Sequence, residues 1–280
     1  MQLISKKVAN VLERKRPLKY LIMRALKATH LCLLFHIDRN SYRLRFYPSV
    51  LSGDLWYEPD LRTEDEFFFK RYLRPGDCLI DIGANIGQLA LLASCAVGQS
   101  GHVIAFEAHP RIFKYLQGNV RLNRARNVLL YNCAVGNDDG TVGFSDRNLD
   151  DVNAVVSSGD CIHIGVCRLD SLPIDRPLIE LLKVDVEGFE KFVFEGAERI
   201  LQKTKCIYFE SWEGNFQHYG YCCHDLFALL RGSGFEIFRL RAPDTVALIS
   251  SDSHSTVCEN LVAVRDRNDF IARTGFTLKD

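Results

Sequence analysis

The first group of residues suited to ligand binding or catalysis is Asp81 and the two glycines that follow it. This aspartate lies in a short apolar run, residues 79–82, and is followed by Gly83, Gly87 and a helix-forming segment. Such an order predicts a strand, a tight turn and a helix N-terminus, which is where α/β proteins hold nucleotide-like ligands. The glycines would let the backbone approach a ligand at positions where a Cβ would clash.

The turn lacks the features of a phosphate site. Neither the third glycine of the dinucleotide pattern nor the Gly-Lys-Ser/Thr ending of a P-loop is present. The Asp81 carboxylate would also repel a pyrophosphate, whereas it suits a cationic ligand. S-adenosylmethionine carries a sulfonium, an amino group and a ribose but no phosphate, so it fits this turn. The alternative is an ordinary turn whose glycines serve packing.

A second acid follows the next predicted strand, residues 102–106. Glu107 lies about twenty residues past the first turn, where a carboxylate can accept hydrogen bonds from two ribose hydroxyls. Nicotinamide enzymes use the same arrangement, so Glu107 indicates an adenosine ligand without choosing between the two cofactors. A solvated carboxylate at a strand end is the alternative.

Two further acids end predicted strands. Asp185 ends residues 180–185, and Glu210 follows residues 206–209. Ligands of open parallel sheets bind outside the carboxyl ends of the strands, and an unpaired carboxylate is costly to bury. Asp185 is therefore the first candidate for orienting or deprotonating a hydroxyl nucleophile, and Glu210 is the second. The alternative for Asp185 is an N-cap of a helix predicted over residues 187–201.

Several motifs occur in the order typical of one family. They are DIGANIG at residues 81–87, AFEAHP at 105–110, NCAVGNDDG at 132–140, RLDSL at 168–172, LLKVDVEGFEKFVFEGAERIL at 181–201 and FES at 209–211. In these motifs the chain resembles the FkbM-type S-adenosylmethionine-dependent methyltransferases, over about residues 42–264. DIGANIG followed by the KVDVEGFE block is a specific combination, whereas either motif alone is weaker.

The resemblance implies a class I methyltransferase fold, which is Rossmann-like, and typically O-methylation of a sugar, polyketide or other small hydroxylated molecule. It also implies where the cofactor lies. Asp81, Gly83, Asn85 and Gly87 would line the methionine end of S-adenosylmethionine, Glu107 would hold the ribose, and the segment from Ala134 to Asn137 would border the adenine. Asp185 and Glu187 match the Asp-Val-Glu-Gly block of the family.

The wider pattern is an alternation of strands and helices. It predicts an α/β fold, with an open, mostly parallel sheet and helices on both faces. We predict a methyltransferase domain over residues 41–280, preceded by a small extension of helix and β structure over residues 1–40. Within the domain, Asp139 and Gly140 before residues 141–144 predict a hairpin turn.

Charge and composition restrict the partners. Lys plus Arg number 35 and Asp plus Glu also number 35, so bulk charge does not indicate nucleic acid. Ten cysteines occur without a secretory pattern, and most lie in apolar runs, which predicts a reduced, cytoplasmic protein. The cluster of His218, Cys222, Cys223 and His224 lacks the usual spacing of zinc ligands, so no metal is expected there or elsewhere.

The N-terminal segment is basic. Between Met1 and Ala28, eight Lys and Arg residues stand against Glu13 alone, and leucines are interleaved with them, which predicts a basic amphipathic helix. No run of about twenty uncharged residues is present to span a bilayer. The helix either packs on the domain with its basic side in water or makes a weak peripheral contact with the inner face of a membrane.

Three functions are compatible with these sequence features. The best supported is an S-adenosylmethionine-dependent methyltransferase that acts on a hydroxyl of a glycan, polyketide or lipid-linked sugar. A nicotinamide-dependent oxidoreductase shares the acid after the second strand, but the missing glycine and Asp81 oppose it. A non-catalytic binding module at the membrane surface would use the basic N-terminus, but the residues of the cofactor turn are all in place.

Overall fold

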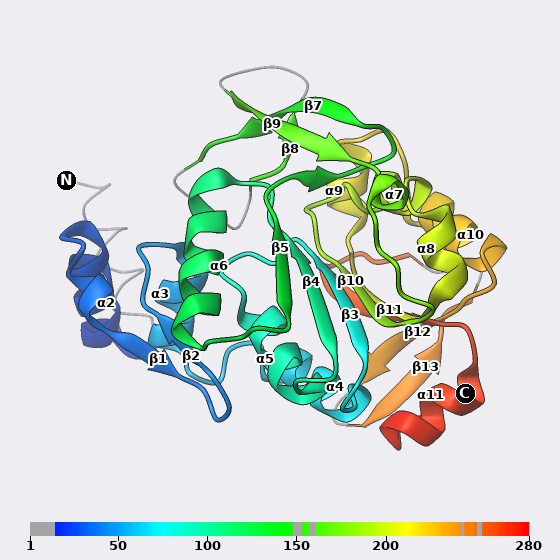
Figure 1. Ribbon diagram of the computed structural model, residues 1–280, viewed down its shortest axis with the longest axis horizontal. Helices are drawn as coiled ribbons and strands as arrows, with labels where there is room; N and C mark the ends of the chain where they lie inside the picture. The colour runs from blue at the N-terminus through cyan, green and yellow to red at the C-terminus, as the bar shows by residue number, and fades with distance from the viewer. Residues whose placement is uncertain (1–14, 148–152, 157–160, 242–243, 251–253, 280) are drawn as a thin grey trace.

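A nine-stranded sheet forms the centre of the molecule (Figure 1). The structure is a computed structural model that describes residues 15–147, 153–156, 161–241, 244–250 and 254–279. From one edge to the other, the strands are β15 (Thr277–Lys279), β13 (Thr245–Leu248), β12 (Glu236–Arg241), β14 (Glu259–Val264), β11 (Thr204–Ser211), β10 (Ile179–Val184), β3 (Cys78–Ile82), β4 (His102–Phe106) and β5 (Val128–Tyr131).

The strands from β11 to β5 are all parallel, and β14 and β12 are antiparallel to their neighbours. This confirms the predicted mostly parallel sheet. All five residues of β3 are buried, as expected of a parallel strand covered on both faces. The chain order reverses between β3 and β10. Open α/β sheets bind ligands at such a reversal, outside the carboxyl ends of the strands.

Helices cover both faces of the sheet, as predicted. Side chains of α4 (Thr63–Tyr72), α5 (Gln88–Val97), α6 (Pro110–Leu122) and α11 (Arg267–Thr274) pack into one core, and those of α7 (Glu190–Glu195), α8 (Glu198–Lys203), α9 (Glu213–Gln217) and α10 (Cys223–Gly232) pack into the other. Successive strand residues point to opposite faces. Leu79 accordingly lies in the first core and Ile80 in the second.

A second, four-stranded sheet lies beyond the carboxyl ends of the parallel strands, at the top of Figure 1. In order across this sheet, its strands are β6 (Ala134–Val135), β9 (Cys161–Cys167), β7 (Gly140–Ser145) and β8 (Val155–Val156). The hairpin predicted at Asp139 is wrong, because β9 lies between β6 and β7. Asp139 instead accepts hydrogen bonds from Arg168 N (2.8 Å) and Ser171 Oγ (2.6 Å), which tie this turn to the segment after β9.

The helix predicted over residues 187–201 is in fact two short helices. Glu187 and Gly188 have φ angles of 55° and 97°, so the chain turns before α7 begins. Gly196 separates α7 from α8, and a Cβ there would lie 1.9 Å from the carbonyl oxygen of Gly136. The close approach of these two backbones explains the glycine at the break. Glu210 lies within β11 rather than after it.

The N-terminal part of the described chain contains α2 (Pro17–Ala28), the 3₁₀ helix η1 (Leu31–Leu34), β1 (His36–Asp38), β2 (Arg43–Arg45) and α3 (Val50–Tyr57). β1 and β2 pair with each other, and the predicted boundary between residues 40 and 41 falls inside this pair. Residues 1–14, with part of the predicted basic helix, lie outside the described residues. No helix in the described ranges is both long enough and apolar enough to cross a membrane.

Candidate active site

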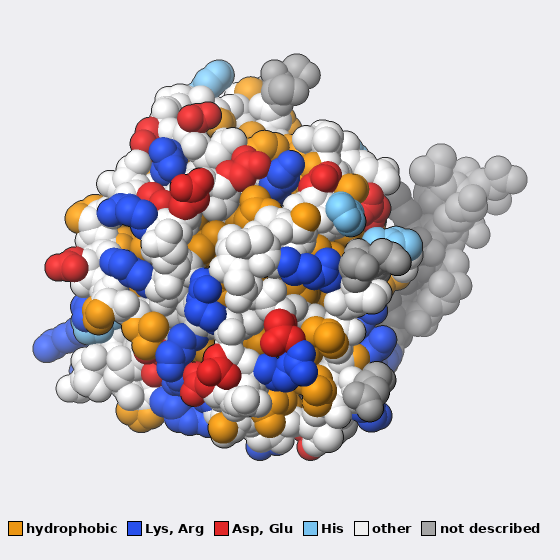
Figure 2. Space-filling view, turned by 90° about the vertical axis from the view of Figure 1, so that its right-hand side faces the viewer, with side chains coloured by type: hydrophobic (Ala, Val, Ile, Leu, Met, Phe, Trp, Pro, Cys, Tyr) orange, Lys and Arg blue, Asp and Glu red, His pale blue; other side chains and the backbone are white. Residues whose placement is uncertain are grey.

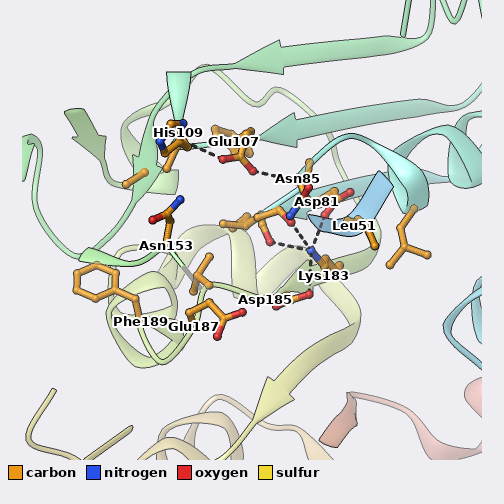
Figure 3. Close-up of a pocket in the computed structure, with 18 of the residues that line it drawn as sticks. Leu51, Asp81, Asn85, Glu107, His109, Asn153, Lys183, Asp185, Glu187 and Phe189 are labelled. Atoms are coloured by element: carbon orange, nitrogen blue, oxygen red, sulfur yellow. Dashed lines mark hydrogen bonds and ion pairs between the residues drawn. The ribbon is translucent and has the colours of Figure 1, made fainter. Parts of the chain in front are cut away.

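A pocket opens at the reversal between β3 and β10 (Figure 3). It is lined by the turn after β3, the end of β4, the segment after β10, part of the small sheet, and residues of α3 and the loop before α4. The predicted residues that line it are Asp81, Gly83, Asn85, Glu107, Ala134, Asp185 and Glu187. The structure therefore brings together acids that the sequence places on three separate strands.

Asp81 is fully buried, and a lysine balances its charge. Lys183 lies directly opposite Asp81 in the register between β10 and β3, and its Nζ is 3.1 Å from Asp81 Oδ1. Only 3% of Lys183 is exposed. A buried charge needs such a partner, because desolvation is costly. Asp81 is thus one half of a buried ion pair, not the isolated anion that the turn alone suggested.

Lys183 also connects the two turns of the pocket wall. Its Nζ donates a hydrogen bond to the carbonyl oxygen of Gly83 (2.7 Å) and lies 3.6 Å from Asp185 Oδ2. Burial by itself would lower the pKa of Lys183, but the attraction of Asp81 and Asp185 raises it above its ordinary value. A charged ammonium therefore joins the glycine turn after β3 to the acid after β10.

Asp185 is held between two cations and is not a helix cap. Besides Lys183, the guanidinium of Arg62 lies 3.7 Å from Asp185 Oδ2. The N-cap position of α7 belongs to Phe189. Glu190 accepts the backbone N–H of Val186 at 3.0 Å. The alternative interpretation of Asp185 as an N-cap is therefore wrong, and its carboxylate is left at the pocket wall.

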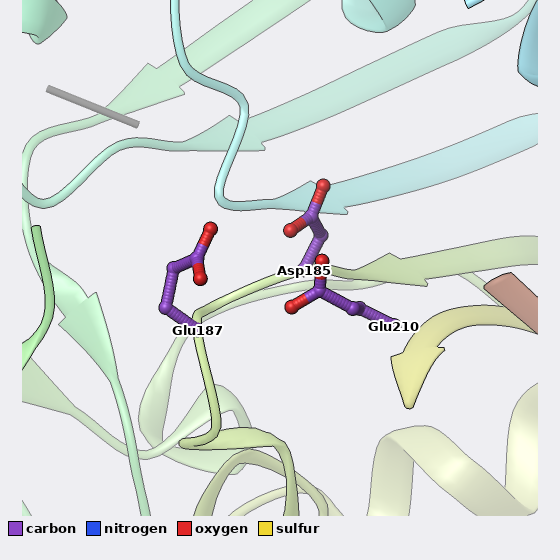
Figure 4. A group of neighbouring side chains, drawn as sticks. All are labelled: Asp185, Glu187 and Glu210. Carbon is purple, nitrogen blue, oxygen red and sulfur yellow. The ribbon is translucent and has the colours of Figure 1, made fainter. Parts of the chain in front are cut away.

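Asp185, Glu187 and Glu210 form a cluster of carboxylates (Figure 4). One oxygen from each lies within 4.8 Å of the others. Burial and the repulsion of Glu210 and Asp185 raise the pKa of Glu187 to about 8, and burial and the repulsion of Asp185 raise that of Glu210 to about 7. Such a cluster has a high affinity for a proton, and its oxygens are ligands of the kind that a divalent cation takes.

Glu107 lies at the end of β4 with 8% of its surface exposed. Its two oxygens accept the backbone N–H groups of Asn85 (2.9 Å) and His109 (2.8 Å). Burial raises the pKa of Glu107 to about 7, against the effect of these hydrogen bonds. Each carboxylate oxygen keeps a second lone pair, so these two bonds leave Glu107 with acceptors for the ribose hydroxyls that the sequence analysis assigns to it.

Buried acceptors in the pocket wall fit a ligand that carries donors. Beyond the ion pair with Lys183, neither oxygen of Asp81 accepts a hydrogen bond from the described part of the chain. The same holds for Oε1 of Gln88, a side chain that is 2% exposed and lines the same pocket. Buried acceptors without donors are costly. The amino group of S-adenosylmethionine would supply the missing donors.

Two of the residues predicted to bind the cofactor, Gly87 and Asn137, lie outside the lining of the pocket. Gly87 has a φ of 90°, and a Cβ there would lie 2.5 Å from a side-chain carbon of Leu116. Its absent side chain therefore allows α5 and α6 to pack. Asn137 donates a hydrogen bond to Glu195 (3.0 Å), which joins the small sheet to α7.

Sheet order and site together define the class of protein. Numbered in chain order within the central sheet, the strands run third, second, first, fourth, fifth, followed by the antiparallel β14 and β12. With acids at the carboxyl ends of the first, second and fourth strands, this is the architecture of a class I methyltransferase. Residues 81–237 match the family model described as the methyltransferase FkbM domain. The chain belongs to the FkbM family of methyltransferases, and its cofactor is S-adenosylmethionine.

The curated proteins that the chain resembles are also named as methyltransferases. The chain is 28% identical over 212 residues to the 31-O-demethyl-FK506 methyltransferase FkbM of Streptomyces tacrolimicus, which covers 61% of this chain and 77% of that protein. It is 28% identical over 135 residues to the ubiquinone/menaquinone biosynthesis C-methyltransferase UbiE of Vibrio cholerae, with 48% and 47% covered. The chain thus spans about half the length of the UbiE relatives that it matches.

Among solved structures, the methyltransferase FkbM from Methylobacillus flagellatus KT aligns with a TM-score of 0.45 at 16% identity. The alignment covers 86% of this chain and 59% of that one.

Three residues of the site were missed by sequence reasoning: Arg62, Gln88 and Lys183. Lys183 had a signal, because it places a cation between the apolar residues Leu182 and Val184 of the predicted strand, four residues before the Glu-Gly step at 187–188. Arg62 had none, since it comes from the loop before α4 and meets Asp185 only through the tertiary fold. The nicotinamide alternative is excluded by the family match.

Proposed function

We propose that this methyltransferase methylates a hydroxyl oxygen of a small molecule and that Asp185 orients and deprotonates this hydroxyl. The supporting observation is the placement of Asp185. Its carboxylate lines the pocket, caps no helix, and is held between Lys183 and Arg62. The two cations fix the side chain in one position, and a positioned carboxylate is what an alcohol nucleophile requires.

Asp185 and Glu187 would have different roles in the reaction. When bound, S-adenosylmethionine supplies an activated methyl group on sulfur. Asp185 would accept the hydrogen bond of the substrate hydroxyl and take its proton as the methyl carbon–sulfur bond breaks and the carbon–oxygen bond forms, which leaves S-adenosylhomocysteine. Glu187, beside it in the pocket wall, has a pKa raised to about 8 by burial and by its acidic neighbours, so it holds a proton near neutral pH and leaves the role of base to Asp185.

The pocket also bears on the substrate class. Part of its wall is apolar: the side chains there are Val50 and Leu51 of α3, Phe144 and Val155 of the small sheet, and Phe189. A hydroxyl carried on a largely apolar skeleton, such as a polyketide alcohol or a lipid-linked sugar, suits this wall better than a free, highly polar glycan. The name of the Streptomyces tacrolimicus relative, with its 31-O-demethyl substrate, is in keeping with transfer to oxygen.

Single-turnover methyl transfer by the Asp185→Asn variant tests the proposal. A panel of polyketide alcohols, lipid-linked sugars and glycans first identifies an acceptor, and mass spectrometry locates the methylated atom. Asn keeps the shape of Asp but cannot take a proton, so the rate should fall by about 10²–10⁴-fold while affinity for S-adenosylmethionine is retained. Asp269→Asn, at an exposed ion pair on α11, is the matched control.

An Asp185→Asn enzyme with full activity would remove Asp185 from the mechanism and move the proposed role to Glu210. Methylation at carbon in every accepted substrate would overturn the assignment to oxygen while leaving the methyltransferase class in place.

A further inference from the structure

Exposed apolar side chains gather at the N-terminal part of the described chain. Of the thirteen large hydrophobic side chains that are exposed among the described residues, seven lie within one stretch of 18 residues. They are Leu18, Leu21, Ile22, Leu31, Leu33, Leu34 and Phe35, and we call them the N-terminal apolar face. Scattered exposed hydrophobic residues are ordinary on a protein surface, but a concentration of this kind marks an interaction site.

α2 does not turn its apolar side toward the core, as a packed amphipathic helix would. Leu18, Leu21 and Ile22 follow the spacing that places residues on one side of a helix, and they are 70%, 49% and 45% exposed. Met23, on the opposite side, is buried in the core. A helix that served only as packing would have its apolar side inward and its basic side in water. Here an apolar side faces solvent.

Two lysines of α2 lie against α3 instead of pointing into water. Lys19 Nζ donates a hydrogen bond to the carbonyl oxygen of Tyr57 (3.1 Å) and lies 5.0 Å from the centroid of the Trp56 ring. Lys27 lies beside Gly53, where an added Cβ would come 3.2 Å from its Nζ. These contacts fix α2 on the domain with Leu18, Leu21 and Ile22 outward.

Within this stretch of the chain, every charged side chain is basic. Five Lys and Arg residues and no Asp or Glu occur between Lys15 and Ile37. Lys15 and Arg24 are exposed. The side of the molecule away from α2 is different: in Figure 2, Lys and Arg are interspersed with Asp and Glu. A surface that combines exposed apolar side chains with basic ones suits a layer of hydrocarbon below anionic head groups.

We propose that the N-terminal apolar face docks this protein on the surface of an anionic lipid bilayer. A second copy of the chain is a poorer occupant, because a symmetric contact through the same face would bring two positively charged surfaces together. A bilayer has no such conflict, since its head groups attract the basic residues while its interface accepts the leucines.

The helix that carries part of this face is one element away from the active-site pocket. α2 packs on α3, and Leu51 and Asp54 of α3 line the pocket. Lys15 and Arg16 line a neighbouring groove with Arg62, which also lines the pocket, and with the acids Glu58, Asp60, Glu64 and Asp65. Docking would therefore bring the pocket close to the bilayer. The inference does not depend on which acceptor is methylated, because vesicle binding is measured without turnover.

Co-sedimentation of the full chain with vesicles tests the proposal. Vesicles of phosphatidylcholine mixed with phosphatidylglycerol should bind the protein at low salt and release it at high salt, since screening weakens surface charge attraction. Vesicles of phosphatidylcholine alone should bind at least about tenfold less, because each basic residue near an anionic surface contributes to binding.

Variants identify the surface. The triple change Leu18→Ser, Leu21→Ser and Ile22→Ser should abolish sedimentation. The matched control is Leu129→Ser, Leu248→Ser and Val257→Ser, which removes three exposed hydrophobic side chains elsewhere and should bind as the parent does. Lys15→Glu with Arg24→Glu should remove the preference for anionic vesicles. Circular dichroism and melting of each variant confirm that it is folded.

Three results would overturn the proposal. The first is no binding of the parent protein to anionic vesicles at low salt, and the second is undiminished binding by the folded triple variant. The third is a dimer of the parent protein in sedimentation velocity that the triple variant dissociates, which would assign the face to a second copy instead.

Discussion

Lys183 explains how several acids can share one wall of the pocket. Its ammonium lies within 3.1 Å of Asp81 and 3.6 Å of Asp185, and it is almost fully buried. Without it, two carboxylates would face each other in a region with little water, and the repulsion would favour protonation of one of them. The site therefore depends on a residue that touches both turns.

We predict that Lys183→Met lowers the free energy of unfolding by about 3–5 kcal/mol, because it leaves the buried Asp81 carboxylate without its partner. Urea unfolding measures the loss. The double variant Asp81→Asn, Lys183→Met should recover part of it, since no uncompensated charge remains. A Lys183→Met protein as stable as the parent would show that the ion pair is not required to hold the pocket wall together.

The buried glutamates predict an unusual pH dependence of stability. Burial raises the pKa of Glu107 to about 7 and that of Glu190 to about 8, and Glu187 and Glu210 are raised similarly. In the unfolded chain these groups lose their protons near the ordinary value of 4.5. Between that value and about pH 8, the folded state therefore binds more protons than the unfolded state.

Because of this difference, the free energy of unfolding of the cofactor-free protein should fall as the pH rises from about 5 to about 8, by up to about 1.4 kcal/mol per pH unit for each group. Urea titrations across this range give the slope, and Glu190→Gln should reduce it. A stability that stays constant or increases with pH over the same range would contradict the raised pKa values.

At the scale of elements, the decisive contact is between the turns after β3 and β10. Gly83 has a φ of 78°, and a Cβ there would lie 1.9 Å from the carbonyl oxygen of Asp185. The two turns thus touch through their backbones. The glycine is required both by its left-handed conformation and by this close approach.

Gly83→Ala should destabilise the protein and weaken S-adenosylmethionine binding, because the new methyl group must push the two turns apart. Gly98→Ala is the matched control: Gly98 also has a positive φ, of 64°, but nothing lies within 4 Å of an added Cβ. The control should cost only the conformational strain, about 1–3 kcal/mol because Gly98 has a ψ of −170° that only glycine adopts readily, with unchanged cofactor affinity. Thermal melting and calorimetric titration separate the two effects, and equal losses in both variants would contradict the packing argument.

At the scale of the whole molecule, the N-terminal part is integral to the domain. Met23 of α2 and Cys32 of η1 are buried in the same core as Phe68 and Leu89. Some side chains of this part are therefore buried in the core, and others face outward and form the N-terminal apolar face.

Deleting residues 1–34 should therefore lower the melting temperature, since removal of a large buried side chain costs about 2–5 kcal/mol. The triple serine variant of Leu18, Leu21 and Ile22 should melt close to the parent, because those side chains are exposed. Differential scanning calorimetry distinguishes the two. A deletion variant with the same melting temperature as the parent would show that α2 and η1 contribute nothing to the stability of the core.

Much of the fold followed from local sequence. Apolar runs of five or six residues, each followed by a turn and a helix-forming segment, predicted the parallel strands and the two layers of helices. Because parallel strands end at one edge of the sheet, four acids were also predicted to meet there. Asp81, Glu107 and Asp185 line one pocket, whereas Glu210 lies beside Asp185 but outside the lining. The motifs in their order were sufficient to indicate the family and the cofactor.

Tertiary structure alone decided the contacts between segments far apart in the chain. The pairing of β9 between β6 and β7 replaced a local hairpin, and the approach of Gly136 to Gly196 divided one predicted helix into two. The strand register placed Lys183 opposite Asp81. Packing on α3 decided which side of α2 faces solvent, because helical periodicity identifies the sides of a helix but not which of them finds a partner.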